Sequence, residues 1–229
     1  PNKDNKGKLY VHCMKNIGVP AFFSYSGGFF SNAEINILLS FMKTVDNPLQ
    51  DIHFVATLRN IYGFSDTDIA RIKTDSNRRI KKSDSFKTES FFEMCKNYSS
   101  EGELKQNIDT FLARLEVLRR MSKHISVSEL LWTLMHENHF YEHLVYGPMG
   151  ELHIANIHLL YSKAIKYDTD INRGLFRFLY YFDDLKKRKA DMDEANAAAE
   201  GMNVVRILSI HKSKGLEFPI VILSDTGKS

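Results

Sequence analysis

The middle of the chain carries apolar residues at regular three- and four-residue steps. This spacing places them on one face of an α-helix, and it is clearest over residues 104–121. Ser126 and Glu129 have the spacing of a capping box, which would begin the next helix at Val127. Nearly all of residues 51–199 is therefore predicted to be helical, with amphipathic stretches at 104–121, 127–144, 152–167 and 174–188.

The first 50 residues combine short helical and strand patterns. A helical pattern over residues 9–16 is followed by glycine, which commonly ends a helix. The apolar run at 19–25 predicts a short strand. A second helix, capped by Ser31 or Asn32, should end before Pro48, because proline disfavours helical dihedrals in the residue that precedes it.

Two apolar, β-branched runs lie near the end of the chain, at 204–210 and 218–223. Neither run alternates with polar residues, which is typical of strands buried on both faces of a parallel sheet. Strand patterns therefore flank the long helical block on both sides. The pattern predicts a mainly α protein in which α/β pieces of one domain are separated by an all-helical insertion.

Composition adds few constraints on function. The chain has 229 residues and a formal net charge of +3, which is too small to indicate a nucleic-acid partner by itself. Its two cysteines are too few for a disulfide framework and suit a reducing compartment. No apolar stretch approaches the roughly 20 residues of a membrane span. The start without methionine and the abrupt end predict a segment of a longer protein.

The loop between the two terminal strand patterns concentrates residues that can bind a ligand. Residues 211–217 hold a histidine, two lysines, a glycine and a glutamate, and ligands of open α/β sheets bind at the carboxyl ends of strands. Histidine and lysine can contact phosphates, and glycine permits close approach of the backbone. The residues alone leave two interpretations open: a phosphate or nucleotide site, or a lysine-rich turn that only solvates the end of a strand.

The run ILSIHKSKGLEFP at 207–219 resembles motif V of the UvrD-like superfamily 1 DNA helicases, and its spelling is most similar to the AddA-type helicase/nuclease proteins. A second resemblance lies near the start of the chain. The segments GVP at 18–20, GGFF at 27–30 and DNPLQD at 46–51 are similar to the stretch after motif IV in these enzymes. IYGFS at 61–65, together with Asp68, resembles the next AddA segment.

This resemblance implies a divided architecture and a parent enzyme. Residues 1–50 and 202–229 would belong to the second RecA-like domain, of the P-loop NTPase type, and 51–201 to its helical insertion subdomain. The parent would be an ATP-dependent DNA helicase and exonuclease that processes DNA ends in double-strand-break repair by homologous recombination. It would use ATP and Mg²⁺, bind single-stranded DNA and the duplex junction, pair with an AddB-type partner and work in the bacterial cytoplasm, away from membranes.

Several parts of such an enzyme do not occur in the 229 residues. They contain no phosphate-binding P-loop, acidic magnesium motif, motif VI arginine or nuclease domain. The final Gly227-Lys228-Ser229 does not complete a P-loop, because Ile222 stands where the first glycine is required. We therefore expect no complete catalytic site here and no ATP hydrolysis by this chain alone.

Motif V also carries the residue roles that the resemblance implies. Gly215 and Glu217 would border the nucleotide, with the Glu217 carboxylate meeting the ATP ribose. Lys212 and Lys214 lie where they could couple the nucleotide and DNA sites, and Lys214 is assigned to this coupling. The residues expected to contact single-stranded DNA are Ser209, His211 and Lys212.

Residues 71–90 contain seven Lys and Arg against three Asp and Glu, and such a run can neutralise duplex phosphates. The predicted duplex-contacting residues are Arg78, Arg79, Lys81 and Lys82. The N-terminus of the helix near Ser65 could also meet a phosphate. Two alternatives remain: a solvated basic loop, or a helical block that acts as a protein-docking or regulatory module of a helicase without nuclease activity.

Two further groups of side chains have ordinary structural interpretations. His136, His139 and His143 fall at helical steps and indicate a solvated or stacking helix surface, so no metal ligand is predicted. The aromatic residues along the helical stripes are predicted to lie in the core rather than to form a base-stacking platform. They are Trp132, Phe140, Tyr141, Phe176, Phe178, Tyr180 and Tyr181.

Overall fold

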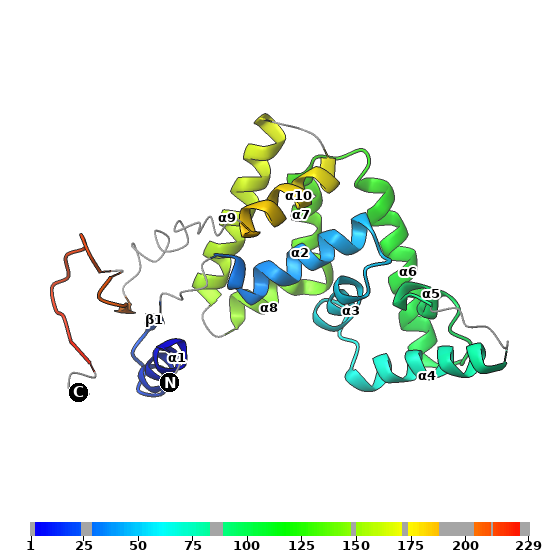
Figure 1. Cartoon of the computed structure of the whole chain (residues 1–229), viewed down its shortest axis with the longest axis horizontal. Coiled ribbons are helices and arrows are strands. Elements are labelled where there is room, and N and C mark those ends of the chain that lie inside the picture. Colours follow the sequence, from blue (N-terminus) through cyan, green and yellow to red (C-terminus); the bar gives the residue numbers. More distant parts are fainter. Residues whose placement is uncertain are drawn as a thin grey trace. The chain divides into compact units, whose positions relative to one another are not determined.

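The computed structural model describes residues 3–23, 29–82, 89–147, 150–170, 174–187, 204–211 and 213–224, and within these ranges the chain is mainly helical (Figure 1). The helices are α1 Lys3–Asn16, α2 Ala33–Asp46, α3 Asp51–Asn60, α4 Asp66–Lys82, α5 Phe91–Lys96, α6 Glu103–Met121, α7 Val127–Met135, α8 Phe140–Tyr146, α9 Gly150–Asp170 and α10 Gly174–Lys187. Two 3-10 turns, η1 Phe29–Ser31 and η2 Glu137–His139, and two strands, β1 Ala21–Phe23 and β2 Val205–Ile207, complete the described elements. The chain divides into two compact units, Pro1–Ser26 with Ala199–Ser229, and Gly27–Ala198.

The first unit joins the two ends of the chain in a parallel sheet. Strand β1 pairs with β2 in the register Ala21↔Val205 and Phe23↔Ile207, and the Val205 amide donates to the Pro20 carbonyl at 2.9 Å. Helix α1 packs against both strands, and a Cβ on its Gly7 would collide with the Phe23 ring. Glycine therefore lets the helix approach the strand closely. The predicted strand runs at 19–25 and 204–210 thus each contain an observed strand, and the structure adds that the two pair in parallel.

The predicted strand at 218–223 is wrong. Residues 218–224 adopt no strand, and Ile220, Val221 and Ile222 are 82%, 74% and 83% exposed. Strand β2 is also shorter than the predicted run, because it ends at Ile207. A strand needs a hydrogen-bonded neighbour, and among the described residues only β1 and β2 form a sheet. An apolar sequence alone does not supply that neighbour.

The helical unit is organised around α2, which packs against α3, α6, α7, α9 and α10. Its apolar side is largely buried, and the unit's fully buried large side chains include Phe41, Met42, Phe54, Phe111, Ile108 and Phe178. Phe111 contacts Phe54 and Tyr62 edge-on, with ring centroids 5.4 and 4.6 Å away. Such aromatic pairs add to the free energy of apolar burial.

The boundaries of the two compact units differ from the predicted domain boundaries. The units separate at residues 26/27 and 198/199, whereas the predicted domain boundaries lie near residue 50 and residue 201. The difference comes from α2, whose buried face lies in the core of the helical unit. The assignment of residues 1–50 and 202–229 to a RecA-like domain stays a prediction.

Helix ends follow the local sequence signals to different degrees. The predicted capping box is confirmed, since the Ser126 side chain accepts from the Glu129 amide and the Glu129 carboxylate accepts from the Ser126 amide. Asn32 occupies the N-cap of α2, but its side chain makes no capping bond. A second capping box, Ser90 with Glu93, begins α5 and was not predicted from the sequence.

The single helix predicted over 127–144 is wrong, because the chain breaks between α7 and α8. Asn138 and His139 adopt left-handed dihedrals, with φ of 48° and 58°. Tertiary contacts account for the break: the Asn138 amide donates to the Ile61 carbonyl at 3.2 Å. Glu137 beside it accepts hydrogen bonds from Arg114, the shortest at 2.8 Å. Asparagine tolerates the left-handed region better than most residues.

A buried carboxylate connects α2 to α9. Glu34 is 3% exposed, its Oε1 accepts from Asn156 Nδ2 at 2.7 Å, and its Oε2 lies 3.0 Å from His153 Nδ1. Burial by itself would raise the pKa of Glu34, but the bonds from His153 and Asn156 bring that pKa below its ordinary value. Because the pKa of Glu34 is lower in the folded chain than in the unfolded chain, this contact stabilises the fold fully at pH values above the unfolded-state pKa. That stabilisation is lost as the pH falls through the folded-state pKa.

None of the helices within the described ranges is long and apolar enough to cross a lipid bilayer.

Candidate nucleic-acid interface

The motif V segment forms two tight turns directly after β2. The Ser213 amide donates to the Ser209 carbonyl at 3.1 Å, and the Ser213 hydroxyl donates to the Ile210 carbonyl at 2.9 Å. The Leu216 amide then donates to the Ser213 carbonyl at 3.0 Å. Gly215 closes the second turn with φ of 85°, in the region that favours glycine. These bonds place the whole segment at the carboxyl end of a parallel strand.

The predicted motif V residues are brought together on these turns. The described ones are all exposed: Ser209, His211, Lys214, Gly215 and Glu217. Lys212 lies outside the described residues. A Cβ on Gly215 would meet no atom within 4 Å, so the backbone there is open to an approaching ligand. The Arg206 guanidinium lies over the Phe218 ring at 5.9 Å, which joins the two ends of the segment.

The N-terminus of α4, which the sequence suggests as a second place for a phosphate, carries two carboxylates in its first turn. Ser65 and Asp68 form a reciprocal cap there, since the Asp68 amide donates to Ser65 Oγ at 3.1 Å and the Ser65 amide donates to Asp68 Oδ2 at 3.0 Å. Asp66 adds a second carboxylate and pairs with Arg59 at 2.8 Å. Two carboxylates therefore already lie at the positive end of the helix dipole, and the phosphate contact there stays a prediction.

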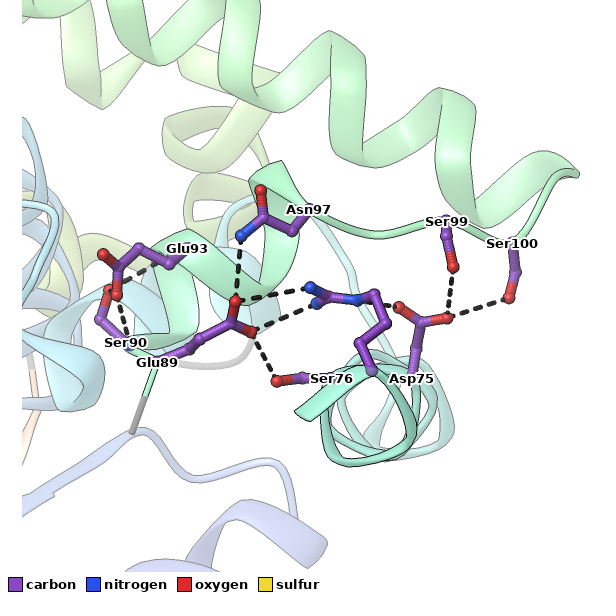
Figure 2. A network of polar contacts seen from close by, with 9 residues as sticks. Asp75, Ser76, Glu89, Ser90, Glu93, Asn97, Ser99 and Ser100 are labelled. Atoms are coloured by element: carbon purple, nitrogen blue, oxygen red, sulfur yellow. Dashed lines mark hydrogen bonds and ion pairs between the residues drawn. The ribbon is translucent and has the colours of Figure 1, made fainter. Parts of the chain in front are cut away.

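The side of α4 that faces α5 is held by a polar network (Figure 2). Arg79 Nε donates to Asp75 Oδ2 at 3.0 Å, and the two terminal nitrogens of Arg79 donate to the Glu89 oxygens at 3.4 and 3.3 Å. Glu89 also accepts from Ser76 Oγ at 2.7 Å and from Asn97 Nδ2 at 3.0 Å. We call the three charged residues of this network the Asp75–Arg79–Glu89 group.

The charges in this group stabilise one another. The hydrogen bond from Ser76, helped by Asn97 and Arg79, lowers the pKa of Glu89. Burial would raise the pKa of Asp75, but bonds from Arg79 and Ser99 lower it. The predicted duplex contact Arg79 is therefore already compensated by two carboxylates, which leaves it poorly placed to bind a phosphate.

The outer side of α4 carries a different set of cations, here called the basic face of α4. Arg78, one of the predicted residues, is exposed. Arg71 and Lys73 are exposed as well, and the sequence reasoning did not single them out although they share the same helix. Lys81 and Lys82 belong to the last turn of α4, but their side chains lie outside the described residues. The helix thus holds Asp75 and Arg79 inward and exposes Arg71, Lys73 and Arg78 outward, where Arg71 also interacts with the Asp68 carboxylate.

The prediction that the aromatic residues of the helical stripes are core holds only for some of them. Phe140 and Phe178 are buried, whereas Trp132, Phe176, Tyr180 and Tyr181 are 52%, 66%, 69% and 41% exposed. Each exposed ring lies on the outer side of an otherwise buried amphipathic helix, which apolar spacing alone does not reveal.

Trp132 belongs to a series of rings on α7, α8 and α9. His136 lies 4.7 Å from Trp132, Tyr161 lies 5.6 Å from Trp132, and Tyr141 lies 5.4 Å from His136. His158 follows Tyr141 at 6.4 Å. We call these five residues the ring array. The stacking role of His136 agrees with its predicted interpretation, and no group of three or more potential metal ligands occurs within the described part of the chain.

Comparisons with known proteins give this geometry a context. The UvrD-like helicase C-terminal domain model matches residues 3–228. A protein from Acetivibrio thermocellus, named as an ATP-dependent helicase/nuclease subunit, is 35% identical over 227 residues, covering 98% of this chain and 17% of that protein. Proteins of the same name from Clostridium botulinum, strain Loch Maree, and Ruminiclostridium cellulolyticum are 34% and 37% identical and cover 98% and 94% of this chain. The chain spans 17–19% of the length of these relatives.

Proposed function

This chain belongs to the family of UvrD-like helicase C-terminal domains, and on that premise we propose that it is a segment of an ATP-dependent DNA helicase and exonuclease. The parent would unwind and process DNA ends in double-strand-break repair by homologous recombination. The observation that carries this proposal is the match over nearly the whole chain to relatives named as ATP-dependent helicase/nuclease subunits. The segment itself would contribute motif V and a DNA-contacting helical insertion, and it would be inactive alone.

Motif V supports the proposal through its position and exposure. Gly215 lies on the second turn after β2 and Glu217 directly follows that turn, so that an open backbone and a solvent-facing carboxylate suit the sugar side of a nucleotide. Ser209 and His211 precede them on the first turn and would contact the backbone and bases of single-stranded DNA, with Lys212 beside them. Lys214 would couple the two. The parent would use ATP with Mg²⁺, and no residue of this chain is assigned to the metal.

The parent activity is tested by purifying the whole protein with its partner, which we expect to be of the AddB type. ATP hydrolysis is measured with and without single-stranded DNA, and strand separation is measured on a duplex with one blunt end. We expect DNA to stimulate hydrolysis and the duplex to be unwound only when ATP and Mg²⁺ are present. A rate of ATP hydrolysis that is the same with and without single-stranded DNA would contradict the helicase assignment.

We propose further that the basic face of α4 binds duplex DNA. Arg71, Lys73 and Arg78 are exposed on one helix, and the neighbouring acidic residues Asp75 and Glu89 are turned inward to Arg79. Exposed cations attract phosphates and release counterions when they bind, and of these three Arg71 also interacts with the Asp68 carboxylate. The contact is sequence-independent, which suits an enzyme that processes DNA ends of any sequence.

This contact predicts salt-dependent binding by the 229-residue chain. Replacing Arg71, Lys73 and Arg78 together by alanine should weaken binding to a labelled duplex by about tenfold or more at low salt, and should flatten the plot of log K against log salt by about 2.7, since each phosphate contact contributes about 0.9. Fluorescence anisotropy at several salt concentrations measures both quantities.

The control removes the same charge elsewhere. Arg120, Lys123 and Lys166 are also exposed, and their triple alanine variant should keep most of the affinity if the site is α4. Equal losses in both variants would mean that binding follows net charge rather than a site. Absence of duplex binding by the unmodified chain at low salt would contradict the proposed contact.

The ring array favours a second candidate function for the helical unit, a docking site for another protein. Trp132 is half-exposed amid Tyr141, Tyr161 and two histidines, and no Lys or Arg belongs to the array. Aromatic enrichment with few charges is typical of the centre of protein interfaces. If the Trp132→Ala variant no longer binds the AddB-type partner but still binds duplex DNA, the result would support docking at this surface.

A further inference from the structure

A helix proposed to bind a polyanion is held in place by acidic residues. Helix α4 packs against α5, and the contact includes Ser76, which is fully buried and donates to Glu89 at 2.7 Å. Glu89 lies two residues before Phe91, the first residue of α5, and also accepts from Asn97, the C-cap residue of that helix. One carboxylate therefore connects the middle of α4 to both ends of α5, as Figure 2 shows.

Arg79 extends this connection back to α4 and onward along the chain. It donates to Asp75, one turn earlier on α4, and to Glu89. Asp75 in turn accepts from the Ser99 hydroxyl at 2.9 Å. The charged side chains of the group are 27%, 12% and 16% exposed for Arg79, Asp75 and Glu89, so these bonds are well shielded from water. Hydrogen bonds between charged groups are stronger than those between neutral ones.

The bonds on Arg79 decide between two roles for it. Its Nε and both terminal nitrogens are already engaged by two carboxylates, whose combined charge exceeds its own. A phosphate approaching this guanidinium would have to displace one carboxylate and face the other. Arg78, the next residue, is exposed and belongs to the outer face. Neighbouring arginines on one helix thus have opposite surroundings.

We propose that the Asp75–Arg79–Glu89 group is a positioning device that fixes α4 on α5 and thereby presents the basic face of α4 to duplex DNA. This inference rests on the proposed duplex contact. It makes Glu89, an acidic residue, a requirement for tight binding of DNA. Simple electrostatics predicts the reverse, because removing a negative charge near a DNA site should strengthen binding.

The first test compares Glu89→Gln with Glu101→Gln in the 229-residue chain. Both variants raise the net charge by one, but Glu101 is exposed beyond the end of α5 and takes no part in the network of Figure 2. E89Q should weaken duplex binding by about fivefold, the effect of about one hydrogen bond's free energy, whereas E101Q should leave affinity unchanged or raise it slightly. Hydrogen exchange of the α4 amides should be faster in E89Q than in E101Q.

The second test compares two neighbouring residues of equal charge, Arg78→Ala and Arg79→Ala. Loss of a direct phosphate contact in R78A should reduce the salt slope by about 0.9. R79A should weaken binding with the salt slope unchanged, because the bound complex keeps its phosphate contacts and binding must reorder the helix. It should also speed exchange of the α4 amides, which R78A should not do.

The outcomes separate this inference from the proposal beneath it. If the unmodified chain binds duplex DNA and E89Q binds as tightly as E101Q or more tightly, the positioning role is wrong and the duplex contact stands. A salt slope in R79A that falls as it does in R78A would make Arg79 a direct contact and would also overturn the inference. If the unmodified chain does not bind duplex DNA, both proposals fail together.

Discussion

Replacing Glu217 by alanine in the whole parent protein should raise the KM for ATP by about tenfold to a hundredfold, because a hydrogen bond to a charged group contributes about 1.5–3 kcal/mol. The carboxylate is exposed directly after the second turn that follows β2, two residues beyond Gly215, where the proposed ribose contact would form. The DNA concentration that gives half-maximal stimulation should change little. Steady-state ATP hydrolysis, titrated separately with ATP and with single-stranded DNA, measures both constants.

The matched comparison is His211→Ala, which lies on the first turn of the same segment. This variant should raise the concentration of single-stranded DNA needed for stimulation and leave the KM for ATP nearly unchanged. Glu101→Ala serves as the charge control, since its side chain lies in the other compact unit. If both motif V variants shift both constants equally, the two turns act as one structural element, and the separate nucleotide and DNA roles are wrong.

The sequence predicted the elements whose formation depends on local pattern. The stripes of α6, α9 and α10 and the box of Ser126 with Glu129 were all found within a few residues of their predicted bounds. Strands β1 and β2 lie within the two runs predicted to be strands, although their pairing with each other was not predicted. In each case the apolar period or the capping spacing determines the structure nearly by itself.

The predictions fail where the local structure depends on a contact with a segment far away in sequence. The break at Asn138 depends on the Ile61 carbonyl, 77 residues away in sequence, and no local signal marks it. The run at 218–223 has the composition of a buried strand, yet strand formation requires a hydrogen-bonded neighbour that the described residues do not provide. Propensity is a weak guide at such positions.

In the candidate site, too, the sequence predicted which residue types occur but not which residues they contact. Counting charges located the basic run of α4, but it could not distinguish Arg78 from Arg79, which differ only in what surrounds them. Glu89 was counted against the site because it is acidic. Its hydrogen bonds to Ser76 and Asn97 give it a supporting role that charge arithmetic does not contain.

The largest loss of stability is expected from Phe54→Ala in the core of the helical unit. Phe54 on α3 is fully buried, and its ring lies 6.3 Å from Phe91, 5.8 Å from Phe92 and 5.4 Å from Phe111. Truncating a buried phenylalanine costs about 3–5 kcal/mol, because it removes apolar burial and leaves a cavity. The loss should lower the melting temperature by roughly 6–20 °C, at 2–4 °C per kcal/mol for a chain of this size.

Trp132→Ala is the matched control, since it also removes a large ring but from a side chain that is 52% exposed. Its cost should be clearly smaller than that of Phe54→Ala, because about half of the Trp132 surface is already in contact with water. Calorimetry or thermal circular dichroism compares the two variants. Because Phe91 and Phe92 belong to α5, Phe54→Ala should also loosen the helix that holds α4, and duplex affinity should fall with stability. Equal melting temperatures for the two variants would mean that the packing between α3 and α5 contributes little to the fold, and would leave the Asp75–Arg79–Glu89 group without a rigid support.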